Sequence, residues 1–252
     1  MNRISIESVM NSFFVSNANA KGPGFGLFSL THIITLCVLG VISFFICRYY
    51  FRASLINRNK LRVILASSIL LLEVFKDIVL SITGQFTFGD LPFQLCGIGI
   101  FIVAYDAFRS NKTSRELMYS LTLPGAIAAL LTPDWVTNHF INLFVWQSFI
   151  IHTLLVSYVL MRMIAKEFQP QWRQLWRVIV FLLIMTPIVS ILNRQWHQNF
   201  FYIETPVAGS PLEPIALIFG SFYILGMVIL VAVIWLVMYL PWIVHGRKNI
   251  NK

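Results

Sequence analysis

The chain has 252 residues, of which 58% are hydrophobic and 12% charged, with a formal net charge of +9 and a mean hydropathy of +0.76. So few charges cannot cover a soluble domain of this length, because a charged and polar surface is what keeps soluble proteins from associating. The composition therefore excludes the soluble globular classes and indicates an all-α, polytopic membrane protein.

Residues 1–26 are predicted to form an extracellular N-terminal segment. Within it, apolar side chains recur at helical spacing opposite Asn2, Glu7 and Asn11, which fits a short helix lying on the membrane surface. The apolar side chains are those of Ile6, Val9, Met10, Phe13 and Phe14. A disordered tail accounts for the same residues equally well.

Seven apolar segments follow, and they meet or approach the roughly 20 residues that a helix needs to cross a hydrocarbon core. They are predicted at residues 27–50, 63–82, 91–108, 117–131, 140–163, 176–192 and 215–244. Together they predict a seven-helix transmembrane domain over residues 27–244, followed by a basic cytoplasmic tail at residues 245–252.

Basic residues occupy every second loop of this arrangement. They are Arg52, Arg58, Lys60 and Arg62, then Arg109, Lys112 and Arg115, then Arg162, Lys166, Arg173 and Arg177, and finally Arg247, Lys248 and Lys252. The opposite loops carry Asp90, Asp134, Glu204 and Glu213, with Arg194 as their one basic residue. The positive-inside rule then places the N-terminus outside and the C-terminus in the cytoplasm. The positive charge reflects topology and attraction to anionic lipids, so no nucleic-acid partner is expected.

The cysteines point to neither a disulfide framework nor a metal centre. Cys37, Cys47 and Cys96 all lie in apolar segments, with no paired spacing and no CxxC motif. We therefore expect no metal ion and no other cofactor.

The third segment, LPFQLCGIGIFIVAYDAF, is the one around which chemistry is expected. Proline has no backbone N–H and fits the first turn of a helix, so Pro92 predicts that the helix begins there. Cys96 would then lie one turn inside the helix, below the membrane surface.

Several reactive side chains are predicted at a similar depth. Counted at about 1.5 Å per residue from the predicted cytoplasmic ends, Glu73, Asp77, Cys96 and His152 fall within one or two helical turns of a common level. Ionisable groups inside a bilayer are costly and normally face the protein interior or a cavity. Glu73, Lys76 and Asp77 also share one helix face, which fits either a polar site or an internal salt bridge that fixes packing.

Cys96 and His152 each have a structural explanation when taken alone, since a buried cysteine usually behaves as a small hydrophobe. Taken together they form a Cys/His arrangement, in which the base raises the thiolate fraction needed for attack on a carbonyl. His32 is predicted at the outer edge of the same cavity. Asn193 and Asn199 bracket the longest outer loop and could donate hydrogen bonds to a lipid carbonyl or headgroup.

Several motifs, in the same order and spacing, resemble those of the bacterial YwaF-type integral membrane proteins. LPFQLC, which contains Gln94 and Cys96, resembles their LPL-x-LC signature. AALLTPDW, WQSFIIH, NFFYIETPVAGSPLEP and the surroundings of His32 in FSLTHIITL also fit. Two features depart from the family pattern: the outer loop lacks the family's lysine, and the last segment lacks its tryptophan-proline pair. These departures bear on acceptor or headgroup specificity.

The resemblance implies a relation to a vertebrate transmembrane acyltransferase that makes arachidonoyl ether phospholipids, which uses the cysteine of LPL-x-LC and a histidine on a later span. More distantly, it implies a relation to small membrane hydrolases of fatty-acid esters of hydroxy fatty acids, which use a threonine and a histidine. Carried over to this chain, Cys96 is the candidate nucleophile and His152 the candidate base. Gln94 belongs to the same motif and is a candidate supporting residue.

The leading functional hypothesis is a lipid acyltransferase or lipid hydrolase of the cell membrane, in particular a bacterial plasma membrane, acting on membrane lipids. In it, Glu73 or Asp77 would orient His152 or hold a headgroup. The alternative is a non-catalytic protein that binds or transports a lipid or small molecule. A subunit that stabilises a partner complex is a third possibility.

Overall fold

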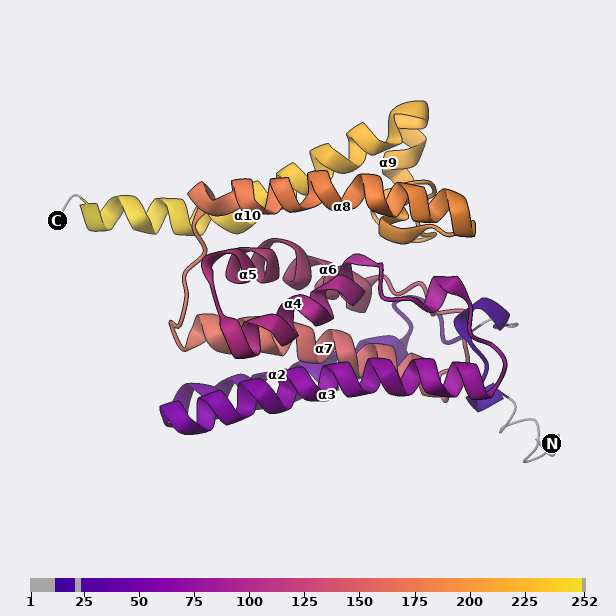
Figure 1. Cartoon of the computed structure of the whole chain (residues 1–252), viewed down its shortest axis with the longest axis horizontal. Coiled ribbons are helices and arrows are strands. Elements are labelled where there is room, and N and C mark those ends of the chain that lie inside the picture. The colour runs from indigo at the N-terminus through magenta and orange to yellow at the C-terminus, as the bar shows by residue number, and fades with distance from the viewer. Residues whose placement is uncertain (1–11, 21–23, 251–252) are drawn as a thin grey trace.

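The computed structural model describes residues 12–20 and 24–250, and within this part of the chain it contains helices and no strands. Long helices run roughly side by side in layers (Figure 1). The surface helix predicted around residues 6–14 falls largely outside the described residues, as does much of the predicted segment 1–26.

The first layer contains α2 (Leu30–Arg52), α3 (Leu55–Ile82), α4 (Leu95–Arg109) and α7 (Leu143–Ile164), with α7 packed against the other three (Figure 1). Polar caps fix where these helices begin. The Ser29 hydroxyl accepts from the backbone N–H of His32, and the Asn142 side chain accepts from the N–H groups of Phe144 and Val145. Such caps satisfy N–H groups that have no partner inside the helix.

A central rod fills the position of the fourth predicted segment. It consists of α5 (Lys112–Leu117), a π-helical turn η3 (Met118–Thr122) and α6 (Leu123–Leu131). All five residues of η3 are buried. Pro124 follows directly and cannot donate a backbone hydrogen bond into the preceding turn, which accounts for the local change of helix type.

The second layer contains α8 (Leu175–Trp196), α9 (Leu212–Phe219) and α10 (Tyr223–Ile250) (Figure 1). Val178 of α8 packs against Leu117 and Leu121 of the central rod. The last helix packs on the main hydrophobic core and is also held by hydrogen bonds: Tyr239 donates to Glu116 over 2.6 Å, and Trp235 donates to the Ser120 carbonyl over 2.9 Å.

The seven predicted segments all coincide with helical rods, but only four helices in the described part have the length and hydropathy of a membrane span. These are Leu30–Arg52, Leu143–Ile164, Trp172–Trp196 and Leu212–Val244. Among the other rods, α3 carries Glu73, Lys76 and Asp77, and α4 has 15 residues.

The predicted start of the third helix at Pro92 is wrong. α4 begins at Leu95 with Gln94 as its N-cap, and Pro92 lies in the preceding turn. That turn folds back onto the helix, because a Cβ atom at Gly97 would lie 2.7 Å from the backbone of Pro92. Glycine at position 97 is what allows this close approach.

Other boundaries also differ from prediction, and α3, for example, begins at Leu55 and not at residue 63. α8 continues four residues beyond 192 to Trp196, so the outer loop is shorter than expected. The seventh rod is interrupted between α9 and α10 at Gly220, whose φ of 49° suits glycine. The helix then continues through most of the predicted tail, to Ile250.

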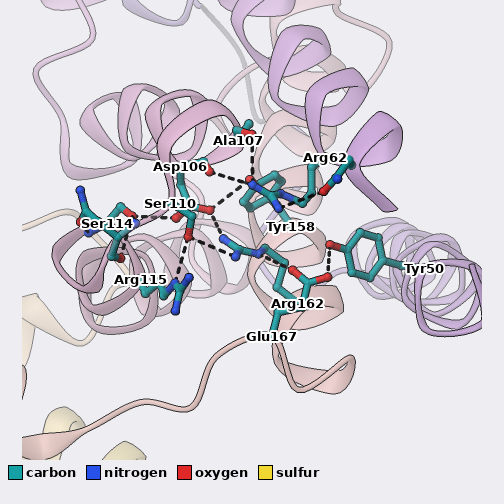
Figure 2. A network of polar contacts seen from close by, with 12 residues as sticks. Tyr50, Arg62, Asp106, Ala107, Ser110, Ser114, Arg115, Tyr158, Arg162 and Glu167 are labelled. Atoms are coloured by element: carbon teal, nitrogen blue, oxygen red, sulfur yellow. Dashed lines mark hydrogen bonds and ion pairs between the residues drawn. The ribbon is translucent and has the colours of Figure 1, made fainter. Parts of the chain in front are cut away.

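A buried ion pair joins the helices at the end of the bundle where the basic residues gather (Figure 2). Arg162 of α7 is 2% exposed and pairs with Asp106 of α4, which is 0% exposed. The Asp106 carboxylate also accepts from the hydroxyls of Ser114, over 2.7 Å, and Tyr158, over 3.2 Å. Both charges are thus compensated by more than one partner.

The same network extends to α2 and α3. Glu167 accepts from Arg162 Nε over 2.9 Å and from the Tyr50 hydroxyl over 2.5 Å. Arg62 of α3 donates to the carbonyl oxygens of Asp106 and Ala107, each over 3.1 Å (Figure 2). Five helices therefore meet in one set of polar contacts.

We expect Arg162→Met to lower the free energy of unfolding by about 3 kcal/mol, because it leaves the Asp106 carboxylate buried without its cation. Thermal unfolding of the purified protein in detergent measures this. Lys166→Met, at an exposed neighbouring position, is the control. Replacing both Arg162 and Asp106 by apolar residues should restore part of the loss, and equal melting temperatures for all variants would contradict this account.

Candidate functional site

His152 of α7 is held in a defined orientation. Its Nδ1 lies 2.7 Å from the carbonyl oxygen of Ser148, and its ring stacks on Trp135 at 5.2 Å with an interplanar angle of 27°. A carbonyl only accepts, so Nδ1 carries the proton and Nε2 of the neutral ring is unprotonated. Within the described residues Nε2 has no hydrogen-bond partner, so it is free to act as a base.

Cys96 is the second residue of α4 and is half-buried. Gly125 of α6 lies beside its sulfur, since a Cβ atom at that position would be in ordinary van der Waals contact with Cys96 Sγ, at 3.6 Å. The other two cysteines lie elsewhere: Cys37 is exposed on α2, and Cys47 is buried in the main hydrophobic core.

α6 and the residues that follow it lie beside both candidate catalytic groups. Gly125 of α6 approaches Cys96 Sγ, and Trp135, which follows Asp134, stacks on the His152 ring. The structure therefore brings the thiol and the imidazole to the same end of the bundle. No hydrogen bond joins them directly in the part of the chain that is described.

Tyr202 covers this end from the outer loop. Its hydroxyl donates to Asp134 over 2.6 Å, and its carbonyl accepts from the Tyr223 hydroxyl over 2.9 Å. Burial and the neighbouring Asp134 carboxylate raise the pKa of Tyr202, so its phenol remains a donor. Phe201 and Tyr202 have φ values of 62° and 52°, a conformation that costs free energy in residues other than glycine and that surrounding contacts must maintain.

Gln94 and Asn193 hold this strained loop in place. Gln94 accepts from the N–H of Phe201 over 2.8 Å and donates to the Asn199 carbonyl over 3.2 Å. Asn193 accepts from the N–H of Phe200 over 2.7 Å and donates to its carbonyl over 3.1 Å. Both amides therefore serve the shape of the loop.

Asn199 also holds the shape of this loop. Its side chain donates to Thr205 and accepts from the N–H groups of Glu204 and Thr205. The loop surrounds an open hollow of about 660 Å³. Arg194 and His197 line this hollow and are exposed, and their side chains make no hydrogen bond or ion pair with another described residue.

His32 is a structural bridge between α2 and α6. It is buried, its Nδ1 accepts from the N–H of Phe28 over 3.1 Å, and its Nε2 donates to the Leu130 carbonyl over 3.0 Å. Because both ring nitrogens are engaged, His32 has no lone pair left to act as a base.

The charged residues of α3 form an internal salt bridge, one of the two alternatives that their spacing allowed. Lys76 pairs with Glu73 at 2.6 Å and with Asp77 at 3.3 Å. Glu73 also accepts from Gln147 of α7 over 3.2 Å, and its charge acts on His152. In the described structure, neither Glu73 nor Asp77 is hydrogen-bonded to the His152 ring, whose Nδ1 is bound by Ser148.

Sequence reasoning missed Asp134, Trp135 and Tyr202 as members of this site. The sequence analysis used Asp134 only as a charge of an outer loop, although the residue lies in the motif AALLTPDW. Tyr202 lies in another such motif, NFFYIETP. Among residues 12–20 and 24–250, no three histidine, cysteine or acidic residues are placed to hold a metal ion.

We expect Gln94→Ala to loosen the outer loop, because two hydrogen bonds worth about 1 kcal/mol each are lost. Hydrogen exchange should become faster over residues 199–203 and stay unchanged in α7. Gln169→Ala, at an exposed position at the other end of the bundle, should leave both regions unchanged. Unaltered exchange of the loop in Gln94→Ala would contradict the anchoring role.

The chain was compared with protein families, curated proteins and solved structures. Neither a curated protein nor a solved structure matches it. The model of the TMEM164 family matches residues 27–239, a range that contains Cys96, Asp134, His152 and Tyr202. Since this range covers most of the chain, the protein belongs to the TMEM164 family and is a membrane protein built of apolar helices.

Proposed function

We propose that this protein is a membrane-embedded lipid acyltransferase or lipid hydrolase that uses Cys96 and His152. The observation that carries the proposal is the state of the His152 ring, whose proton is fixed on Nδ1 by Ser148 while Nε2 stays free. Cys96 lies at the same end of the bundle, and α6 and the residues that follow it lie beside both groups. The resemblance to YwaF-type proteins and to the vertebrate acyltransferase supports the same pair.

In the proposed reaction, Cys96 Sγ forms a bond to the carbonyl carbon of an ester or thioester while His152 Nε2 takes the thiol proton. The proton has to leave as the bond forms, because apolar surroundings disfavour a free thiolate. The tetrahedral intermediate then releases an alcohol or thiol, which takes the proton from His152. An acyl thioester remains on Cys96.

The second half of the reaction removes the acyl group. An alcohol of a second lipid, or water, loses its proton to His152 and attacks the thioester, which restores the thiol. A lipid alcohol gives acyl transfer and water gives hydrolysis. During both halves, the carboxylate of Asp134 would stabilise the positive charge that develops on His152.

Arg194 and His197 are proposed to hold the headgroup of the substrate. Their side chains line the outer hollow and have no other partner among the described residues. The guanidinium of Arg194 and an imidazole N–H of His197 suit a phosphate group, which accepts several hydrogen bonds. Gln94 connects this hollow to the helix that carries Cys96. It lies two residues before Cys96 and forms hydrogen bonds with the loop around the hollow.

The seven helical rods are proposed to be seven membrane spans over residues 27–244, with the N-terminal segment outside and residues 245–252 in the cytoplasm. The alternation of charge between successive loops supports this arrangement. The proposed location is the cell membrane, in particular the plasma membrane of a bacterium.

Cys96→Ala and His152→Ala should each lower acyl transfer or lipid hydrolysis by about a hundredfold or more, because nucleophile or base is lost. Cys37→Ala, which removes an exposed cysteine of α2, is the matched control and should keep full activity. Mass spectrometry of the purified wild-type protein should find an acyl adduct at position 96. Lipid binding or flux that persists in Cys96→Ala, with no adduct in the wild type, would favour the non-catalytic alternative.

The topology is tested separately by labelling single cysteines with a membrane-impermeant reagent, in a background without the three native cysteines. We expect a cysteine replacing Arg194 to be labelled in intact cells. One replacing Lys60 should react only after permeabilisation, and the opposite pattern would reverse the proposed orientation.

A further inference from the structure

A second hollow, of about 110 Å³, lies at the basic end of the bundle, opposite the end that holds Cys96 and His152. Lys112, Arg115 and Glu116 of α5 line one side, and Gln169, Gln171 and Gln174 line the other. Neither the proposed reaction nor the packing of the core uses this hollow.

The hollow carries excess positive charge that is not used by protein contacts. Lys112 is exposed and has no hydrogen-bond or ion-pair partner in the described structure. Arg115 uses only Nε, which donates to Ser110 over 2.9 Å, so both terminal nitrogens remain free. Arg177 lies beside them, with NH1 bonded to Thr113 over 2.9 Å and Nε to Gln174 over 2.8 Å.

The one carboxylate of the hollow is already engaged. Glu116 is buried, and its two oxygens accept from the N–H of Gln171 over 2.9 Å and from the Tyr239 hydroxyl over 2.6 Å. The hollow is therefore lined by two cations, with Arg177 beside them, and by one carboxylate whose lone pairs are partly used. The side-chain amides of Gln169 and Gln171 are exposed and make no hydrogen bond with another described residue, so they offer further donors.

The walls of the hollow are fixed by the buried network of Figure 2. The hydroxyl of Ser110 accepts from both Arg115 and Arg162, and the Arg162 guanidinium lies 5.6 Å above the ring of Phe168, which also lines the hollow. Groups held in place before binding lose little entropy when a ligand arrives.

The surroundings place this hollow at the level of lipid headgroups. Trp172 and Trp176 are more than half exposed next to it, and Arg173 and Arg177 stack on them at 5.8 and 4.8 Å. Exposed tryptophans of membrane proteins concentrate at the interface between hydrocarbon and water. Beyond Arg177, the exposed apolar side chains of Ile179, Leu183 and Ile184 continue along α8 and offer a surface for acyl chains.

We propose that this hollow binds the headgroup of one anionic phospholipid from the leaflet at the basic end of the bundle. Lys112 and Arg115 contact the phosphate, with Gln169 and Gln171 as additional donors, and the acyl chains lie along α8. Basic pockets between helices on this side of a membrane are suited to such headgroups. The site is separate from Cys96 and does not depend on the proposed reaction.

The test uses the full-length protein purified in detergent and offered phosphatidylglycerol or, as a neutral lipid, phosphatidylcholine. Native mass spectrometry counts retained lipids, and thermal unfolding measures stabilisation. The double variant Lys112→Gln/Arg115→Gln is compared with Lys60→Gln/Lys166→Gln, which removes the same charge from the same end but outside the hollow. If size-exclusion chromatography shows that the double variant does not fold, Lys112→Gln alone is used for the comparison. The Lys112 side chain makes no contact that folding needs.

We expect the wild type and the control pair to retain one phosphatidylglycerol in preference to phosphatidylcholine. The hollow variant should bind it roughly tenfold or more weakly. Equal retention by the hollow variant, or an equal loss in the control pair, would overturn the proposal in favour of diffuse surface charge. Equal stabilisation by inorganic phosphate alone would also overturn it, because the hollow would then be a site for a free anion.

Discussion

The buried pair of Arg162 and Asp106 is the interaction on which the rest of this structure depends. Opposite charges lie in a part of the bundle where almost no surface of either side chain is exposed. Such a pair is stable only when its remaining hydrogen-bonding groups are satisfied, and here tyrosine, serine and glutamate side chains from several helices do so. The requirement fixes how α2, α3, α4, α5 and α7 meet at the basic end.

The opposite end of the bundle is organised differently, by a loop instead of a charge pair. Phe201 and Tyr202 are held in a costly backbone conformation by Gln94 and Asn193. The result is that Tyr202 reaches Asp134, next to Trp135 and the His152 ring. One end of the molecule is thus closed by buried charge, while the other carries a half-buried thiol and an imidazole with a free nitrogen.

Much of the helical arrangement was predictable from the sequence. Its apolar stretches are about as long as a membrane-spanning helix, and the charge of the loops between them alternates. The positions of all seven rods follow from these patterns. Their exact ends do not: the start of α4 depends on the close approach of Gly97 to Pro92, and the break at Gly220 depends on a single backbone torsion. Such features arise from contacts between residues, which hydropathy does not encode.

The candidate site was predictable only in part. The ion pairs of α3 were one of the two outcomes that the spacing of its charged residues allowed. The proton position on His152 required the Ser148 carbonyl, and the engagement of both nitrogens of His32 required Phe28 and Leu130. Asn193 and Asn199 were expected to donate to a lipid, but their side chains form hydrogen bonds within their own loop. A sequence shows which residues carry amides but not which groups these amides bond.

The way α10 is attached has a mechanical consequence. In its second half, Trp235, Tyr239 and Trp242 of α10 donate hydrogen bonds to Ser120, Glu116 and Tyr119 of the central rod, whereas near its start Tyr223 makes one hydrogen bond, to the carbonyl of Tyr202. A displacement of the start of α10 would therefore act, through the Tyr223 hydroxyl, on Tyr202, which donates to the Asp134 carboxylate.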